Sequence, residues 1–155
     1  MTAPVVRIRP ARDTDLAAIV ALLADDALGR QRVQPADPLP PVYRQAFAEM
    51  GEERGNLMLV AEIEQVLVGC LQLTIIPGLS RTGMKRAQIE AVRVGSAWRG
   101  RGIGERLVRH AIEMARTAGC GLVQLTTDKS RADAHRFYEA LGFTASHIGM
   151  KLNLD

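Results

Sequence analysis

The sequence is organised around Ile89-Glu90-Ala91-Val92-Arg93-Val94, followed by Arg99-Gly100-Arg101-Gly102-Ile103-Gly104. The first segment is mostly apolar and predicts a strand, and a helical pattern starts at Ile103. Glycine has no Cβ, so the loop between strand and helix can turn sharply and offer its main chain to a ligand. The first amides of a helix have no intrahelical partners, and the helix dipole favours an anion there. The segment therefore predicts either a phosphate-like anion site or only a tight turn.

The spacing of the glycines excludes two common phosphate motifs. It is not G-x-G-x-x-G, because the third glycine comes one residue early, and it is not a P-loop, because the lysine is missing. The net charge of +3, from 20 basic and 17 acidic residues, does not demand nucleic acid. The basic excess gathers between Arg93 and Arg109, where the only acid is Glu105. A small anionic ligand explains this concentration, and so does a solvated helix face.

Length and composition indicate an ordinary globular protein. A chain of 155 residues fits one domain over residues 1–155 with a single buried core. No apolar run approaches the roughly 20 residues that a membrane helix needs, and the N-terminus lacks the apolar segment of a signal peptide. Cys70 and Cys120 lie in apolar runs, which favours buried thiols in a reducing compartment over a disulfide or a metal site. We therefore expect a soluble, cytoplasmic protein without a metal.

Hydrophobic periodicity predicts an α/β fold with a mixed sheet, in the order β-α-α-β-β-β-α-β-α-β. Four prolines between residues 29 and 41 predict a loop without regular structure. Ser130 and Asp133 resemble a capping box at the start of the last helix. The predicted strands cover 5–9, 56–63, 66–76, 88–94, 122–126 and the alternating tail 148–154. The predicted helices cover 16–27, 43–50, 103–118 and 130–141, the third ending at Gly119.

From Gln88 to Phe143 the sequence closely resembles the GNAT superfamily of N-acetyltransferases. Arg99, Gly102 and Gly104 fill the family pattern Arg/Gln-x-x-Gly-x-Gly/Ala. The second match is Phe137-Tyr138-Glu139-Ala140-Leu141-Gly142-Phe143 at the end of the last helix. The two motifs at this spacing are more specific than either alone, and the predicted element order also matches. The resemblance implies the acyl-CoA N-acyltransferase fold and acetyl transfer to an amine.

The resemblance further implies acetyl-CoA as cosubstrate, held between diverging fourth and fifth strands. Main-chain groups of Val92 and Val94 would hold the pantetheine arm, and amides from Arg99 to Gly104 the pyrophosphate. Arg131 departs from the family, since many members have Asn there, and it could meet a phosphate instead. The implied cofactor-binding residues are Val92, Arg93, Val94, Arg99, Gly100, Arg101, Gly102, Ile103, Gly104, Glu105 and Arg131.

Acetyl transfer needs a base for the amine, a donor for the oxyanion and an acid for the leaving thiolate. Tyr138 is the candidate acid, because the family places a tyrosine here against the sulfur; the alternative is a core tyrosine. Glu90 is the candidate base, directly or through water, because it is an acid within an apolar strand, where burial would raise its pKa. Strand period places it on the face of Val92 and Val94. The alternative for Glu90 is an ion pair with Arg86 or Lys85.

The acceptor is expected at the proline-rich loop, the second helix and the loop 77–85. Four arginines there suit an anionic group: Arg30, Arg32, Arg44 and Arg81. The Ile89-Glu90 strand and the Gly119-Cys120 junction also resemble amino-sugar-phosphate acetyltransferases. We expect a small-molecule amine as partner, no nucleic acid and no membrane, with a homodimer left open. The alternatives are a non-catalytic acyl-CoA sensor, or an acetyltransferase acting on protein N-termini or lysines.

Overall fold

The computed structural model describes residues 2–155 and divides into two compact units. The first unit extends to Gln124, and the second runs from Leu125 to Asp155. The single domain over residues 1–155 stays a prediction. None of the helices within residues 2–155 is long and apolar enough to cross a membrane.

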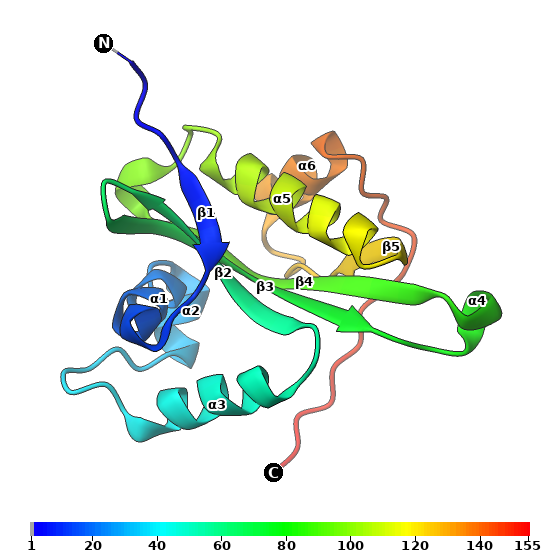
Figure 1. The fold of residues 1–155 in the computed structure, drawn as a ribbon, viewed down its shortest axis with the longest axis horizontal. Helices are drawn as coiled ribbons and strands as arrows, with labels where there is room; N and C mark the ends of the chain where they lie inside the picture. The colour runs from blue at the N-terminus through cyan, green and yellow to red at the C-terminus, as the bar shows by residue number, and fades with distance from the viewer. Residues whose placement is uncertain (1) are drawn as a thin grey trace. The chain divides into compact units, whose positions relative to one another are not determined.

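The first unit is built on a five-stranded sheet in the order β1-β2-β3-β4-β5 (Figure 1). The first four strands pair antiparallel with their neighbours. Between β4 and β5 the chain passes through a helix, the crossover that parallel neighbours need, so the sheet is mixed. The strands are β1 (Arg7–Pro10), β2 (Asn56–Ile63), β3 (Val66–Ile76), β4 (Lys85–Val94) and β5 (Cys120–Leu125). The predicted fold class is confirmed.

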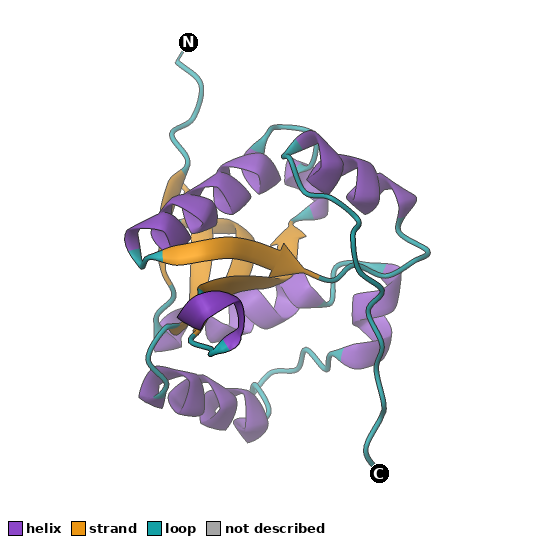
Figure 2. Cartoon of the chain, turned by 90° about the vertical axis from the view of Figure 1, so that its right-hand side faces the viewer, coloured by secondary structure: helices purple, strands orange, loops and turns teal. Residues whose placement is uncertain are grey.

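Helices cover both faces of this sheet (Figure 2). Helix α5 (Ile103–Thr117) packs on β3 and β4 through the apolar face that its period predicts, with Ile103, Leu107 and Ala111 buried. The other face carries α1 (Leu16–Leu23) and α3 (Pro41–Glu52). Its core cluster consists of Ile19, Leu22, Met58, Val60 and Cys70. The remaining helices are α2 (Ala27–Arg32), α4 (Ser80–Gly83) and α6 (Ala132–Ala140).

Long periodic segments have the predicted bounds. Strands β2 and β3 occupy the predicted 56–63 and 66–76, and the turn between them has Glu64 and Gln65 at φ 48° and 69°. These values match a two-residue type I′ turn, whose twist suits a hairpin. Helix α5 begins at the predicted Ile103, and Gly119 at φ 80° follows its last turn.

Some predictions about secondary structure are wrong. Helix α2 occupies 27–32 and extends into the segment 29–41 that was expected to be irregular, because Asp26 accepts a hydrogen bond from the amide of Gly29 and the prolines begin only at residue 35. The capping box is absent from α6: Arg131 is the N-cap, and the Ser130 hydroxyl donates to Asp128 instead. Residues 148–154 form no strand, although their pattern alternates.

Candidate active site

Strand β4 contains a β-bulge at the point where the sequence predicts the reaction site. Glu90 pairs with Gln72 and Arg93 with Cys70, so β4 has one residue more than β3 in this interval. Ala91 accommodates the bulge with φ 53°, which is uncommon for a residue with a Cβ. Bulges re-aim side chains and are over-represented next to active sites. The sequence gives no sign of this bulge, because alanine rarely adopts such a conformation.

The bulge changes which residues share a face with Glu90. Gln72 and Cys70 are two residues apart on β3, so Glu90 and Arg93 project on the same face of the sheet. Val94 pairs with Gly69 and therefore projects on the opposite face. The predicted shared face for Glu90 and Val94 is wrong, because a period of two does not survive an inserted residue.

Glu90 is exposed and accepts a hydrogen bond from the side-chain amide of Gln88. The side-chain amide of Gln124 on β5 in turn donates to the side-chain oxygen Oε1 of Gln88 at 3.0 Å, which orients the Gln88 amide toward Glu90. The expected burial of Glu90 is therefore wrong. Lys85, a predicted alternative partner, donates instead to the carbonyl of Ala118 at 2.9 Å. The carboxylate is accessible to a substrate amine or to water.

The glycine loop (Arg99–Gly104) presents main-chain amides to open space. Gly100 and Gly102 have φ 74° and 76°, and a Cβ at either position would meet nothing within 4 Å. Gly102 is the N-cap of α5, with no side chain capping the helix, and the amide of Arg106 is bonded to the Gly102 carbonyl at 3.1 Å. The amides of Ile103, Gly104 and Glu105 consequently have no acceptor within the helix. This geometry fits a diphosphate, because helix dipole and amides favour the same charge.

Arg99 holds the glycine loop against the rest of the first unit. Its Nε donates to the Val94 carbonyl at 3.1 Å, and its Nη2 donates to the Asp25 carbonyl at 2.8 Å. The Asp25 carboxylate accepts from the amide of Ser96 at 2.8 Å. The Arg99 guanidinium is therefore bonded to two main-chain carbonyls, one at the end of β4 and one after α1.

Other arginines of the basic segment are also engaged within the chain. Arg93 forms an ion pair with Asp26 at 3.1 Å, and its Nη1 donates to the Val92 carbonyl. Glu105 pairs with Arg109 at 2.8 Å. The Arg101 guanidinium lies 5.0 Å from the centre of the Trp98 ring, a cation–π contact. These guanidinium groups are engaged within the chain, whereas the first amides of α5 have no acceptor within the helix.

The sequence prediction missed Asp25 and Asp26, which anchor the loop and β4. Both acids follow directly after the apolar pattern of α1, and this pair was the available signal. The sequence could not show which residues these acids contact, since Asp25 and Arg99 are far apart along the chain.

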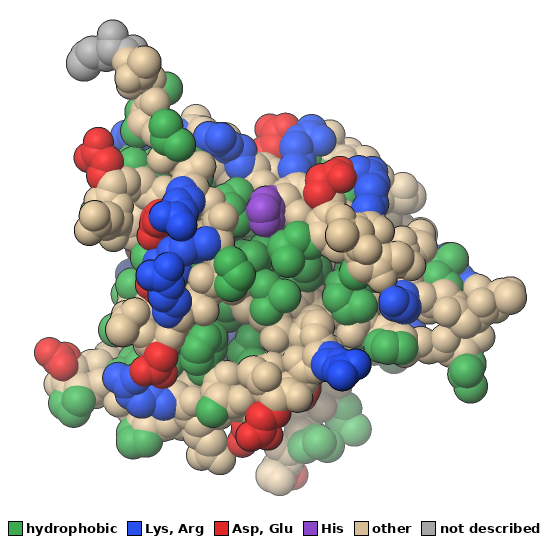
Figure 3. Space-filling model, viewed as in Figure 1, with side chains coloured by type: hydrophobic (Ala, Val, Ile, Leu, Met, Phe, Trp, Pro, Cys, Tyr) green, Lys and Arg blue, Asp and Glu red, His purple; other side chains and the backbone are tan. Residues whose placement is uncertain are grey.

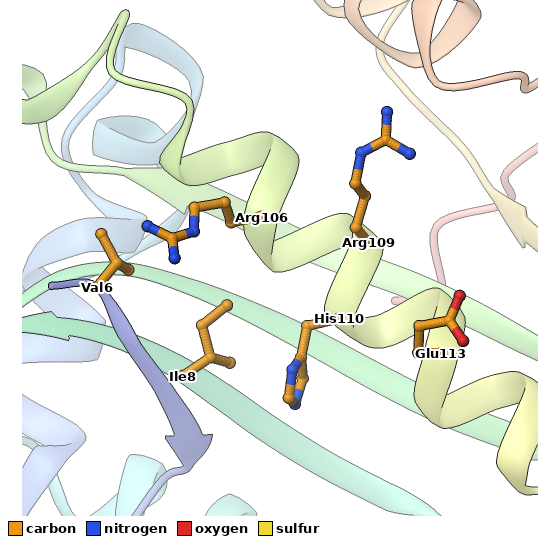
Figure 4. A pocket seen from close by; sticks show the side chains of 6 residues that line it. All are labelled: Val6, Ile8, Arg106, Arg109, His110 and Glu113. Carbon is orange, nitrogen blue, oxygen red and sulfur yellow. The ribbon is translucent and has the colours of Figure 1, made fainter.

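Surface hollows lie on the part of the first unit that the structure describes. One, of about 410 Å³, lies between the β1 segment and α5 and is lined by Val6, Ile8, Arg106, Arg109, His110 and Glu113 (Figure 4). Hydrophobic side chains gather beside a histidine on this face (Figure 3). The second hollow, of about 650 Å³, is lined in part by Trp98 and Arg101. Among the described residues, only Arg101 of the predicted site lines either hollow.

The second unit carries Tyr138 and Arg131. The Tyr138 ring is half-buried and lies edge-on between Phe137 and Phe143, with centroid distances of 5.0 and 5.8 Å. Gly142 at φ 96° ends α6: its amide donates to Glu139, and the Phe143 amide donates to Tyr138. These two bonds form a Schellman motif. Arg131 is the N-cap of α6: its carbonyl accepts from the His135 amide at 3.2 Å, and its amide donates to the Asp128 carbonyl at 3.0 Å.

Comparison with known proteins decides the family. The model of the acetyltransferase (GNAT) family matches residues 17–143, which include the bulged strand, the glycine loop and the Tyr138 motif. The chain belongs to the GNAT acetyltransferase family. It is an N-acetyltransferase, and members of this family generally use acetyl-CoA.

The chain of this acetyltransferase is similar to two curated enzymes and to one solved structure. The glucosamine 6-phosphate N-acetyltransferase of Trypanosoma brucei brucei is 30% identical over 151 residues, 96% of each chain. The aminoalkylphosphonate N-acetyltransferase of Salmonella typhimurium is 43% identical over 61 residues, 39% of this chain and 40% of that one. Among solved structures, the transcriptional regulator from Bacillus halodurans C-125 has a TM-score of 0.94 and 51% identity, covering 96% of this chain and 99% of that one. Both named enzymes act on small amines.

Proposed function

We propose that this acetyltransferase transfers an acetyl group from acetyl-CoA to the primary amine of a small molecule that also bears a phosphate or phosphonate. Two relatives support the acceptor class, since glucosamine 6-phosphate and the aminoalkylphosphonates both combine an amine with a phosphorus oxyanion. The amine attacks the thioester directly, since the sequence indicates no Cys-His or Ser-His-Asp arrangement that would favour an acyl-enzyme. Burial raises the pKa of the Cys70 thiol to about 12, which argues against a covalent acetyl-cysteine there.

The observation that carries the proposal is the uncapped start of α5. The amides of Ile103, Gly104 and Glu105 would bind the pyrophosphate of coenzyme A, with the main chain of Arg99 to Gly102 closing around it. Val92 and Val94 would offer main-chain groups to the pantetheine arm, and Arg131 a charge to a phosphate. Acetyl-CoA, when bound, supplies an acetyl group activated as a thioester.

Three groups of this chain transfer the protons and stabilise the negative charge of the reaction. Glu90 accepts a proton from the attacking ammonium, directly or through a water molecule, so that the free amine can react. The amide of Val94 donates to the carbonyl oxygen as negative charge develops on it. The Tyr138 hydroxyl donates a proton to the departing sulfur, and the tyrosinate regains a proton as the nitrogen loses its second one on forming the amide. Exposure of the Glu90 carboxylate supports its role, because a base must reach the acceptor.

The acceptor's phosphorus oxyanion would meet the arginines of the first unit. Arg30 and Arg32 are exposed in the last turn of α2, and Arg81 is exposed in α4. Arg44 is less available, since it pairs with Asp13 at 2.9 Å. The anionic group would thus distinguish these acceptors from a protein N-terminus or a lysine side chain.

A charge placed at the start of α5 tests the cofactor site. Gly104→Asp puts a carboxylate at the second position of the helix, which favours the helix but repels a bound diphosphate. Val42→Asp is the matched control, because Val42 is the exposed second residue of α3. We expect calorimetric titration with coenzyme A to show affinity lowered at least tenfold by Gly104→Asp and unchanged by Val42→Asp. Equal affinity in all three proteins would overturn the assignment of the pyrophosphate to this loop.

A further inference from the structure

Neutral hydrogen-bonding side chains surround Glu90 on its face of the sheet. Strands β3 and β4 run side by side (Figure 1), and their register places Gln72 opposite Glu90 and Thr74 opposite Gln88. Residues directly opposite in an antiparallel pair project from the same face, with Cβ atoms about 4.5–5.5 Å apart. We call Gln72, Thr74, Gln88 and Glu90 the polar square. A small molecule whose amine contacts Glu90 therefore lies close to the other three side chains.

Contacts from the two neighbouring strands hold the polar square. From β5, the Gln124 side chain donates to Gln88 at 3.0 Å. From β2, Oδ1 of Asn56 accepts from Nε2 of Gln72 at 3.0 Å and from the Thr74 hydroxyl at 3.4 Å. The carboxamides are therefore oriented before a ligand binds, as a specific binding site requires.

This face of the sheet changes character between Cys70 and Gln72. Cys70 is buried in the apolar cluster that α1 and α3 cover. Further along β3, Gln72 and Thr74 are half-buried and polar. A carboxamide has two N–H donors and an oxygen with two lone pairs, so the bond to Asn56 uses only part of the capacity of Gln72. Half-buried groups with remaining capacity favour a ligand that both donates and accepts hydrogen bonds.

Hydroxyl groups have the chemistry that fits the polar square. A hydroxyl both donates and accepts, as the carboxamides and the Thr74 side chain do. A phosphorus oxyanion only accepts, and the Glu90 carboxylate would repel it. A bare alkyl chain would displace water from the half-buried amides without replacing the hydrogen bonds of that water, which is costly. A hydroxyl therefore suits the polar square better than either of these groups.

We infer that the polar square is a hydroxyl-binding subsite, so that the acceptor is an amine flanked by hydroxyl groups. The subsite rests on the proposed acetyl transfer and narrows its acceptor from any amine with a phosphorus oxyanion to a polyhydroxylated one. Gln72 is the specificity-determining residue, because it lies directly opposite Glu90 and so is closest to the substituents beside the amine.

Deoxy analogues of one amine test the subsite. Glucosamine 6-phosphate has a hydroxyl on each side of its amine, and the 1-deoxy and 3-deoxy analogues each lack one of them. We expect the wild type to prefer the parent over at least one analogue by roughly tenfold or more in kcat/KM, because a site built for a hydroxyl is left unpaired without it. Gln72→Leu removes the amide at similar size and should lower this preference to less than about threefold, with the affinity for coenzyme A unchanged.

Two further variants control for effects outside the subsite and for folding. Gln45→Leu removes an amide from the exposed side of α3, where Gln45 donates to Glu49 at 3.2 Å, and should keep the wild-type preference. Thr74→Val keeps the shape of the side chain without its hydroxyl and should lower the preference. Circular dichroism checks each fold, and Thr74→Val decides the result if Gln72→Leu does not fold.

The outcomes separate the subsite from the acetyl transfer on which it rests, with 2-aminoethylphosphonate as a fourth amine that has no hydroxyl on carbon. No acetylation of any of the four amines overturns both. Higher kcat/KM for 2-aminoethylphosphonate, equal kcat/KM for the parent and both analogues, or a preference that survives in the folded Gln72→Leu and Thr74→Val proteins overturns the subsite alone. A preference lost equally in Gln45→Leu also overturns the subsite, because the effect then does not arise at the polar square.

Discussion

The amide of Phe143 donates a hydrogen bond to the carbonyl oxygen of Tyr138 at 3.1 Å, and the rings of the same two residues meet edge-on at 5.8 Å. Gly142 makes both contacts available, because its φ of 96° turns the chain back over the last turn of α6. The motif Phe-Tyr-Glu-x-x-Gly-Phe is thus a helix cap that fixes the direction of one tyrosine ring.

Removing the ring of Phe143 should loosen Tyr138. An edge-to-face pair contributes about 0.5–1.5 kcal/mol, so Phe143→Ala should lower kcat by roughly three- to tenfold and leave KM for acetyl-CoA nearly unchanged. Phe143→Tyr keeps the ring and is the matched control. Steady-state kinetics measures both, and an unchanged kcat in Phe143→Ala would argue against a positioned Tyr138.

Glu90→Gln should impair proton removal from the acceptor. Loss of a general base typically costs about 10²–10⁴-fold, so kcat/KM should fall by roughly 10²-fold at pH 7. The defect should shrink as the pH rises toward the pKa of the amine, because the solvent then removes the proton. A pH profile measures this, with Glu113→Gln on the exposed side of α5 as control. A defect of equal size at every pH would contradict the base role.

Asp15→Asn should destabilise the fold in a pH-dependent way. Arg9 donates to both Asp15 oxygens, at 2.7 and 3.0 Å, and this contact holds the pKa of Asp15 below its usual 3.8. A lowered pKa in the folded state stabilises the protein above the unfolded value and loses that stabilisation as the pH falls through the folded value. Breaking a buried pair costs about 3–5 kcal/mol, so we expect a loss of about 3 kcal/mol at pH 7, diminishing below pH 3.8.

Urea unfolding followed by circular dichroism at several pH values measures this loss. Asp13→Asn is the control, because the Asp13–Arg44 pair is exposed and should contribute about 0–1 kcal/mol. Equal losses for the two variants at pH 7 would contradict the assignment of stability to the Arg9–Asp15 pair.

Cys70 should be unreactive in the folded protein. Burial raises the pKa of its thiol to about 12, and its Sγ lies 3.6 Å from the Ala91 carbonyl. We expect an aromatic disulfide at pH 8 to label only the half-buried Cys120 rapidly, and both thiols after unfolding. Rapid labelling of two thiols in the folded chain would contradict this. The result also sets the background for assays that detect released coenzyme A.

Local patterns predicted the elements that have strong periodicity. Strands β2 and β3 and the start of α5 have the predicted bounds, because alternation and the helical period extend over many residues in each. The glycine loop was predicted as well, since its conformation depends on glycine itself. These features are encoded within a few neighbouring residues.

Features that depend on distant residues could not be predicted in this way. The bulge at Ala91 arises from pairing with β3, and it moved Glu90 away from the face of Val94. The engagement of Arg99 depends on Asp25, which lies between α1 and α2, far from Arg99 along the chain. The tail has the pattern of a strand, but within the described residues it forms none.

The most direct test of the account measures coenzyme A release from acetyl-CoA with matched pairs of amines. Glucosamine 6-phosphate is compared with glucosamine, and 2-aminoethylphosphonate with ethanolamine, using the wild type and Tyr138→Phe. We predict that kcat/KM is at least tenfold higher for the phosphorus-bearing member of one or both pairs, and that Tyr138→Phe lowers kcat with coenzyme A affinity unchanged. No release above hydrolysis with any of the four amines, or equal turnover by Tyr138→Phe, would contradict it.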